Sequence, residues 1–220
     1  LRAIVDEARA HNLKVECHSH GKHVVMTAIR AGCATIEHGS YLDEEALRLM
    51  KEKGTVWDPT YTSVLGFLLP FGDYDSSAAM LRGPYIVHNM QRMLRKGIEM
   101  GVLIITATDT QYGPKSDTRI SREITNFVEF GMTPLQALQS ATIVSAKVYG
   151  LESKTGAIEP GLEADLLAVG GNPLEDIWVV HEPMFVMSNG RLVYHRTLTE
   201  KGYIAPKVEW TGFGTGGPLP

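Results

Sequence analysis

The chain has 220 residues, of which 44% are hydrophobic and 21% charged, and it carries a formal net charge of −4. This length is enough for one large domain or two small ones with a substantial buried core. The mildly acidic balance argues against nucleic acid as a partner, and no apolar run approaches the ~20 residues of a membrane-spanning helix. Cys17 and Cys33 are too few for a disulfide framework and form no CxxC metal pair, and we expect Cys17 to be a small buried apolar residue.

The first part of the chain alternates amphipathic helices with short apolar runs. It opens in the middle of a helical pattern and without a starting Met, so we expect upstream sequence to be missing. We predict helices over residues 1–12, 24–30 and 43–53, and strands over residues 13–17, 34–37 and 55–57. Asp43 is suited to cap the third helix, and Gly54 is suited to end it.

Residues 60–83 are rich in Gly, Pro, Tyr and Ser, and this composition predicts a long irregular loop. A helix over residues 84–100 then precedes the most apolar strand, which covers residues 102–106. Two further helices are predicted over residues 119–130 and 134–149, the second with Thr133 as its N-cap. Short buried strands that alternate with helices are typical of an α/β protein with a parallel sheet.

The pattern changes near Gly150. Short alternating runs at residues 156–158, 164–169, 185–188 and 192–194 are separated by turn residues, and Asn189-Gly190 is typical of a type I′ hairpin. These runs predict a small antiparallel β unit. We therefore divide the chain into a first domain over residues 1–150, an accessory β unit over residues 151–200 and an extended tail over residues 201–220.

Side chains that bind metals follow three of the predicted parallel strands. His18 and His20 follow the first strand, His38 follows the second, and Asp109 follows the fourth. In α/β barrels the active site lies at this strand-end face, and imidazoles with a carboxylate suit a divalent ion such as zinc, which lowers the pKa of bound water to about 7. Each residue also has an ordinary interpretation, as a structural histidine, a helix-entry residue for His20 or an N-cap for Asp109.

Two longer motifs narrow this interpretation. The first is His-Ser-His-Gly at residues 18–21, followed by Ala-Ile-Arg-Ala-Gly-Cys-Ala-Thr-Ile-Glu-His-Gly-Ser at residues 28–40. The second is Met-Thr-Pro-Leu-Gln-Ala-Leu at residues 132–138, which leads to a Gly-x-Ile-x-Pro-Gly-x-x-Ala-Asp-Leu segment at residues 156–166. From Leu1 to about Tyr194 the chain resembles the amidohydrolase superfamily, in particular its imidazolonepropionase-like and Xaa-Pro dipeptidase (prolidase)-like enzymes.

This resemblance implies the C-terminal half of a TIM (β/α)8 barrel plus part of a small β-sandwich. It assigns His18 and His38 to the second of two metals, and Asp109 to the first metal and to general base catalysis. The metal it implies is zinc, as one or two ions in the intact enzyme. The family's first-strand His-x-His pair and its carboxylated lysine would lie before Leu1.

Three further residues are candidates for substrate contacts. His20 lies two residues beyond His18, and Tyr61 follows the third predicted strand. Arg82, in the irregular segment, is a candidate partner for a substrate carboxylate. Packing within the loop is an equally good interpretation of Tyr61, and an ordinary surface position is the default for Arg82.

The resemblance implies a metal-dependent hydrolase that uses activated water to cleave amide or peptide C–N bonds of a dipeptide or an N-acyl amino acid. Two alternatives stay open. One is a truncated or non-catalytic fragment that needs N-terminal strands, and the other is cyclic amidase or deaminase chemistry on the same scaffold. We expect the intact enzyme to be a homo-oligomer, favour a cytoplasmic location, and expect no nucleic-acid or membrane partner.

Overall fold

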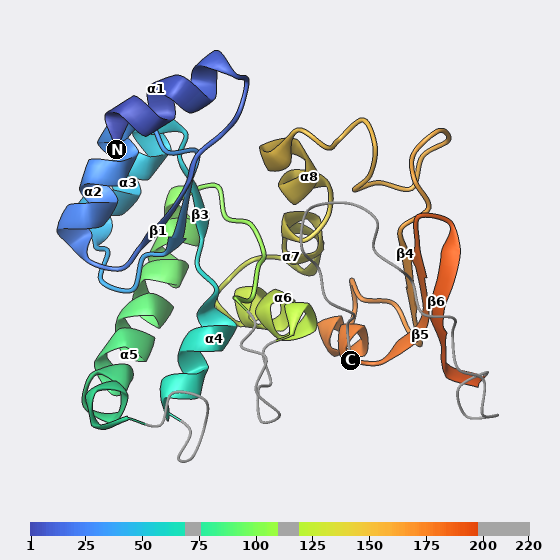
Figure 1. The fold of residues 1–220 in the computed structure, drawn as a ribbon. Coiled ribbons are helices and arrows are strands. Elements are labelled where there is room, and N and C mark those ends of the chain that lie inside the picture. The colour runs from blue at the N-terminus through green and yellow to red at the C-terminus, as the bar shows by residue number, and fades with distance from the viewer. Residues whose placement is uncertain (69–75, 110–118, 198–220) are drawn as a thin grey trace.

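The chain folds as an α/β protein with two separate three-stranded sheets (Figure 1). The computed structural model describes residues 1–68, 76–109 and 119–197, so the predicted tail over residues 201–220 lies outside the described residues. The first sheet is parallel and the second is antiparallel. Figure 1 shows α6, α7 and α8 between the two sheets, with α1, α2, α3 and α5 on the other side of the parallel sheet.

The parallel sheet has the order β1–β2–β3, formed by Glu16–Ser19, Thr35–His38 and Val56–Asp58. Each strand ends one or two residues later than its apolar run predicts. His18 and His38 therefore lie inside strands rather than after them, because the ladder continues to the pair Ser19 and His38. The fourth predicted strand, over residues 102–106, lies parallel to β3 but forms only an isolated bridge between Trp57 and Ile104.

The three helices that precede β3 lie near their predicted ranges, and the third begins and ends where Asp43 and Gly54 predict. They are α1 (Arg2–Ala10), α2 (Lys22–Ala31) and α3 (Glu44–Lys53). The Asp43 side chain accepts from the backbone N–H groups of Glu45 and Ala46, and Gly54 ends α3 in the left-handed conformation. Fully buried side chains between helices and sheet, such as Ile36, Leu47 and Trp57, form the main core.

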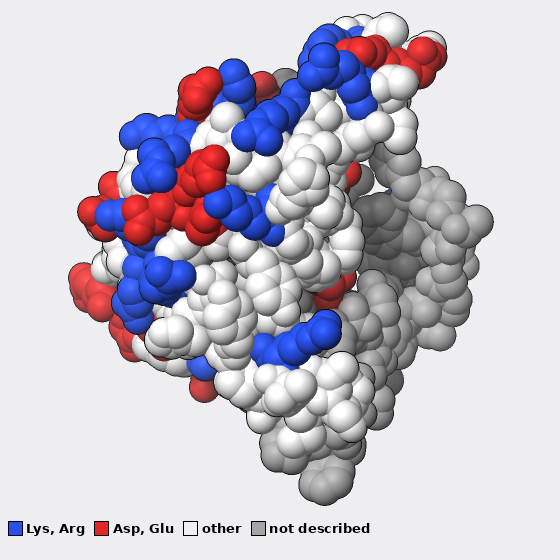
Figure 2. Space-filling view, turned by 90° about the vertical axis from the view of Figure 1, so that its left-hand side faces the viewer, with Lys and Arg blue, Asp and Glu red and all other residues white. Residues whose placement is uncertain are grey.

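The charges on the outer helices are paired rather than segregated. Figure 2 shows basic and acidic side chains interspersed on the face that carries these helices. Lys22, for example, lies 2.6 Å from a carboxylate oxygen of Asp43 and 2.7 Å from one of Glu45. This face therefore presents no continuous basic surface of the kind that binds a phosphate backbone. Among the described residues, no helix combines the length and the apolar character that a bilayer span requires.

The prediction of a long irregular loop over residues 60–83 is wrong for its described parts. A short helix α4 (Tyr61–Leu65) and a 3-10 turn η1 (Gly66–Leu68) follow β3, and α5 runs over Ser77–Met100 with Pro84 inside it. Ser76 caps α5 by accepting from the N–H of Ala79. The beginning of α4 is bonded to a side chain 62 residues away, Glu123, which no local pattern reveals.

The single helix predicted over residues 134–149 is also wrong, because it divides into α7 (Pro134–Ser140) and α8 (Ile143–Tyr149). The hydroxyl of Ser145 donates to the carbonyl of Ser140 at 2.6 Å, and that of Thr142 donates to Leu138 at 2.8 Å. Such hydroxyl-to-backbone bonds compete with the helical ladder. Before α7, helix α6 covers Ile120–Glu129, as predicted to within a residue.

The second sheet consists of β4 (Leu166–Val169), β5 (Pro183–Ser188) and β6 (Arg191–His195). β5 and β6 pair as a hairpin, and both turn residues, Asn189 and Gly190, have positive φ as a type I′ turn requires. The run at residues 156–158 does not form a strand. The 3-10 helix η2 (Ile177–His181) packs this unit against α6.

A disulfide joins Cys17, in β1, to Cys33, which lies two residues before the start of β2. Their Cα atoms are 6.1 Å apart. Both cysteines are buried, as expected for Cys17, but neither is a free thiol. Cys33 lies 16 residues after Cys17, and only the parallel pairing of β1 with β2 brings them together. Two cysteines are too few for a disulfide framework, but they do form this single bond, which was not predicted from the sequence.

Candidate metal centre

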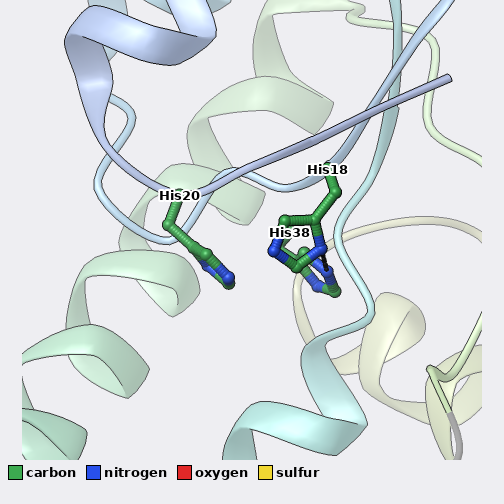
Figure 3. A group of neighbouring side chains, drawn as sticks. All are labelled: His18, His20 and His38. Atoms are coloured by element: carbon green, nitrogen blue, oxygen red, sulfur yellow. Dashed lines mark hydrogen bonds between the residues drawn. The ribbon is translucent and has the colours of Figure 1, made fainter.

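Three histidines meet at the C-terminal edge of the parallel sheet. His18 lies in β1, His20 directly follows it, and His38 is the last residue of β2. Parallel strands bring their C-terminal ends to one edge, so side chains 20 residues apart in sequence become neighbours. Figure 3 shows the three rings gathered there, with those of His18 and His38 in contact.

The geometry of the cluster is compact. Nδ1 of His18 lies 2.8 Å from Nε2 of His38, and the ring of His20 stacks on that of His38 with centroids 4.7 Å apart. Each histidine offers one ring nitrogen, and the three nitrogens lie within 4.8 Å of one another. Within the described part of the chain, His18, His20 and His38 form a group of metal-binding side chains that lie close enough together to share one ion.

An unusual backbone conformation at the end of β2 turns His38 into the cluster. His38 and Gly39 have φ values of 64° and 65°, in the left-handed region. By register His38 is paired with buried Ser19, yet its ring contacts His18, whose side chain leaves β1 on the opposite face. The indole of Trp57 holds this conformation by donating to the carbonyl of His38 at 3.0 Å.

Burial keeps the rings of His20 and His38 neutral. Burial is the main cause that lowers the pKa of His38 to about 4, with further lowering by His20 and His18 and an opposing effect of Asp109. Burial and then His18 also lower the pKa of His20, again against Asp109. At neutral pH the two rings therefore keep lone pairs, which is the form of histidine that binds a metal.

Asp109 stands near this cluster without being part of it. It is exposed, has a φ of 46°, and ends the described range of residues 76–109. Its negative charge raises the pKa of both His20 and His38, although its carboxylate is not within the 4.8 Å group. Its assignment as metal ligand and general base stays a prediction.

The three substrate candidates lie in different environments. The ring of His20 joins the other two histidines, and its Nδ1 is hydrogen-bonded to the hydroxyl of Ser40 at 2.9 Å. Tyr61 is buried instead, with its hydroxyl accepting from Gln91 at 2.7 Å, which matches the packing interpretation. Arg82 is an exposed residue of α5. His20 was predicted from the sequence as a substrate contact, apart from the metal ligands His18 and His38, whereas the structure brings the three residues together.

Below the histidines, carboxylates line the same face of the sheet. Glu37 is in register with His18 on one side and with Asp58 on the other. Burial is the main cause that raises the pKa of Asp58 to about 8, followed by the charges of Glu123, Glu37 and Glu16. One carboxylate oxygen of Asp58 is buried without a hydrogen-bond partner within the described ranges. Asp58 is therefore held in its neutral form.

Sequence reasoning missed the residues that support His38. Nδ1 of His38 is hydrogen-bonded to the hydroxyl of Thr60 at 2.7 Å, and Thr60 directly precedes α4. Glu123, which has no exposed surface, binds the first turn of the same helix. A single glutamate in an otherwise amphipathic helix gives no sequence signal of this role.

The donor set fits a divalent ion. Neutral imidazole nitrogens are preferred ligands of zinc, which binds them at ~2.0–2.1 Å. A nearby carboxylate balances the charge of the ion, as Asp109 does for the protonated rings. The cluster therefore combines donors and charge of the right kind.

Comparisons with known proteins agree on the relationship of the chain. A model of the amidohydrolase family matches residues 1–193. The chain is similar to ochratoxinase of Aspergillus niger, with 36% identity over 187 residues that cover 84% of this chain and 38% of the relative. Imidazolonepropionase of Sphingopyxis alaskensis is 28% identical over 185 residues, which cover 82% of this chain and 39% of that protein.

A solved structure shows the same fold. The crystal structure of a Xaa-Pro dipeptidase with methionine bound in its active site matches with a TM-score of 0.78 and 34% identity. The match covers 88% of this chain and 48% of the dipeptidase. The chain thus spans half or less of the length of these relatives.

Proposed function

The chain belongs to the amidohydrolase family, and on that premise we propose that it forms part of a metal-dependent hydrolase of amide or peptide C–N bonds. The observation that carries the proposal is the group of His18, His20 and His38 at one edge of the parallel sheet. The neutral rings of His20 and His38 suit a divalent ion, and the carboxylate of Asp109 acts on both rings electrostatically.

We propose further that the parallel sheet is part of a (β/α)8 barrel, of which residues 1–150 supply the C-terminal half. Residues 151–200 would then belong to a small β-sandwich, and residues 201–220 to an extended tail. The alternation of β1, β2 and β3 with helices supports this arrangement, as does the match to about half of the dipeptidase structure. A (β/α)8 barrel needs eight parallel strands, so the proposal requires further strands beyond those of the parallel sheet described above.

His18, His38 and Asp109 would hold one or two ions, with zinc as the metal that this donor set favours. When bound, the ion supplies a Lewis acid for the substrate carbonyl and lowers the pKa of a water molecule. The Asp109 carboxylate accepts the proton of the attacking water and transfers it to the leaving nitrogen. Ser40 and Thr60 orient the rings of His20 and His38 through Nδ1.

We propose a dipeptide or an N-acyl amino acid as the substrate. The proposal includes no nucleic-acid partner and no membrane partner. The likeness to a Xaa-Pro dipeptidase supports this class, and exposed Arg82 is a candidate partner for its carboxylate. The likeness to an imidazolonepropionase supports cyclic amide hydrolysis as a second candidate. A homo-oligomeric enzyme and a cytoplasmic location remain part of the proposal.

Replacing Asp109 with Asn tests the general base. The variant should fold and lose at least ~100-fold in kcat, because general acid–base catalysis contributes about that much or more. The measurement is turnover of a panel of dipeptides, N-acyl amino acids and cyclic amides in the presence of zinc. Asp6→Asn, an exposed position on α1, is the matched control. Unchanged kcat in Asp109→Asn would exclude this role.

A further inference from the structure

A chain of hydrogen bonds leads from a fully buried carboxylate to the ring of His38. The two carboxylate oxygens of Glu123 accept from the backbone N–H groups of Tyr61 and Thr62, at 2.7 Å each. These are the first N–H groups of α4, which have no partner within the helix. Because Tyr61 and Thr62 are buried, the oxygens of Glu123 satisfy N–H groups that would otherwise be left without partners. Glu123 thus fixes where α4 begins.

Thr60, the residue directly before α4, connects this helix to the histidine. Its hydroxyl donates to the carbonyl of Pro59 at 2.8 Å and is also 2.7 Å from Nδ1 of His38. A hydroxyl has a single proton, so an oxygen that donates to Pro59 accepts from its other neighbour. With the hydroxyl directed to Pro59 in this way, Nδ1 of His38 carries the ring proton, and Nε2 presents its lone pair to the cluster.

The backbone of Thr60 shows that the surrounding structure imposes this position. Thr60 has a φ of 46°, a left-handed conformation that is costly for a β-branched residue. Such conformations persist only where neighbouring contacts enforce them, often at functional sites. Here the bonds of Glu123 to the next two residues and that of the Ser63 hydroxyl to the Thr60 carbonyl, at 2.9 Å, enforce it.

We propose that Thr60 is a positioning residue that keeps the proton of His38 on Nδ1, and that Glu123 acts through α4 to hold Thr60 in place. The proposal rests on the proposed function in one respect, since it makes Nε2 of His38, the ring nitrogen without a proton, a metal donor. The tautomer itself is a property of the metal-free chain. His18 then donates from its own Nδ1 to Nε2 of His38, which accounts for their 2.8 Å separation.

The first experiment reads the tautomer directly. Long-range 1H–15N NMR of the metal-free 220-residue chain, with the His38 signals assigned from a His38→Gln variant, distinguishes Nδ1–H from Nε2–H. We expect Nδ1–H in the wild type and in Thr60→Ser, which keeps the hydroxyl. Thr60→Val keeps the shape but removes the acceptor, so its His38 should shift toward Nε2–H. Thr27→Val, on the exposed face of α2, is the control.

The second experiment measures zinc binding in competition with a chromophoric chelator. Loss of a partner that orients a ligating histidine typically weakens metal affinity by ~10–100-fold, and we expect that loss in Thr60→Val. Thr60→Ser should restore affinity. Glu123→Gln should show a smaller loss of affinity, because its amide NH2 cannot accept and so loses only one of the two backbone hydrogen bonds. Glu129→Gln, at the exposed end of α6, is the control and should bind zinc as the wild type does.

The outcomes separate this proposal from the proposed function. An unchanged His38 tautomer in Thr60→Val, or Nε2–H in the wild type, would overturn the positioning role even if zinc binds. A tautomer shift in Thr60→Val combined with no zinc binding by any variant would support the positioning role and overturn the metal site. If Glu123→Gln does not fold, the Thr60 pair alone decides the result.

Discussion

The two sheets of this protein are held in place in different ways. In the parallel sheet all three residues of β3 are buried, and Ile36 and Trp57 have no exposed surface. In the antiparallel sheet no residue of β4, β5 or β6 is fully buried. That unit reaches the main core instead through Ile177 and Val180 of η2.

The difference explains where a precise site is built. Nearly complete burial of β2 and β3 leaves their residues little freedom, so strained positions such as His38 and Thr60 are maintained. The antiparallel sheet is a single, half-exposed layer and does not restrict its residues in this way. The three following predictions test this contrast.

The largest effect should come from Trp57. Replacing it with Ala removes a fully buried ring and its bond to the His38 carbonyl, and should lower the free energy of unfolding by about 3–5 kcal/mol. Tyr194→Ala in β6 removes a half-buried ring and should cost less than about 1.5 kcal/mol. Urea unfolding of both variants measures the difference, and equal losses would remove the contrast.

Reduction of the Cys17–Cys33 disulfide should come next. The bond closes a loop over a separation of 16 residues, for which chain entropy predicts a loss of about 3 kcal/mol. Hydrogen exchange should accelerate in β1 and β2 but not in β4–β6. A variant with Ala at both positions should be insensitive to the reductant. Acceleration in both sheets would show that they unfold as one unit.

The smallest effect concerns Asp58. Its folded pKa of about 8 lies above its ordinary value of 3.8, so the stability that its neutral form provides is complete below pH 3.8 and is lost as the pH rises through 8. Asp58→Asn cannot ionise. It should match the wild type near pH 4 and exceed it by about 1–3 kcal/mol at pH 9, the usual cost of an unsatisfied buried group. Equal pH slopes in both proteins would show that Asp58 ionises freely.

The sequence predicted what local chemistry decides. Asp43 and Gly54 set the ends of α3, Thr133 caps α7, and the strand-end pattern brought His18 and His38 together. It could not predict features that depend on distant partners. The Cys17–Cys33 bond, the beginning of α4 on Glu123 and the support of His38 by Thr60 all join segments that meet only after folding.

The pairing of the strands also bears on the order of folding. Parallel pairing joins Cys17 to Ile36, 19 residues later, whereas the hairpin joins Val186 to Tyr194, only 8 residues later. Loop-closure entropy delays distant contacts, and hairpins form within about 1–10 μs. We therefore expect the hairpin to form early and the histidine cluster late, so that occupancy of the cluster would report completion of folding.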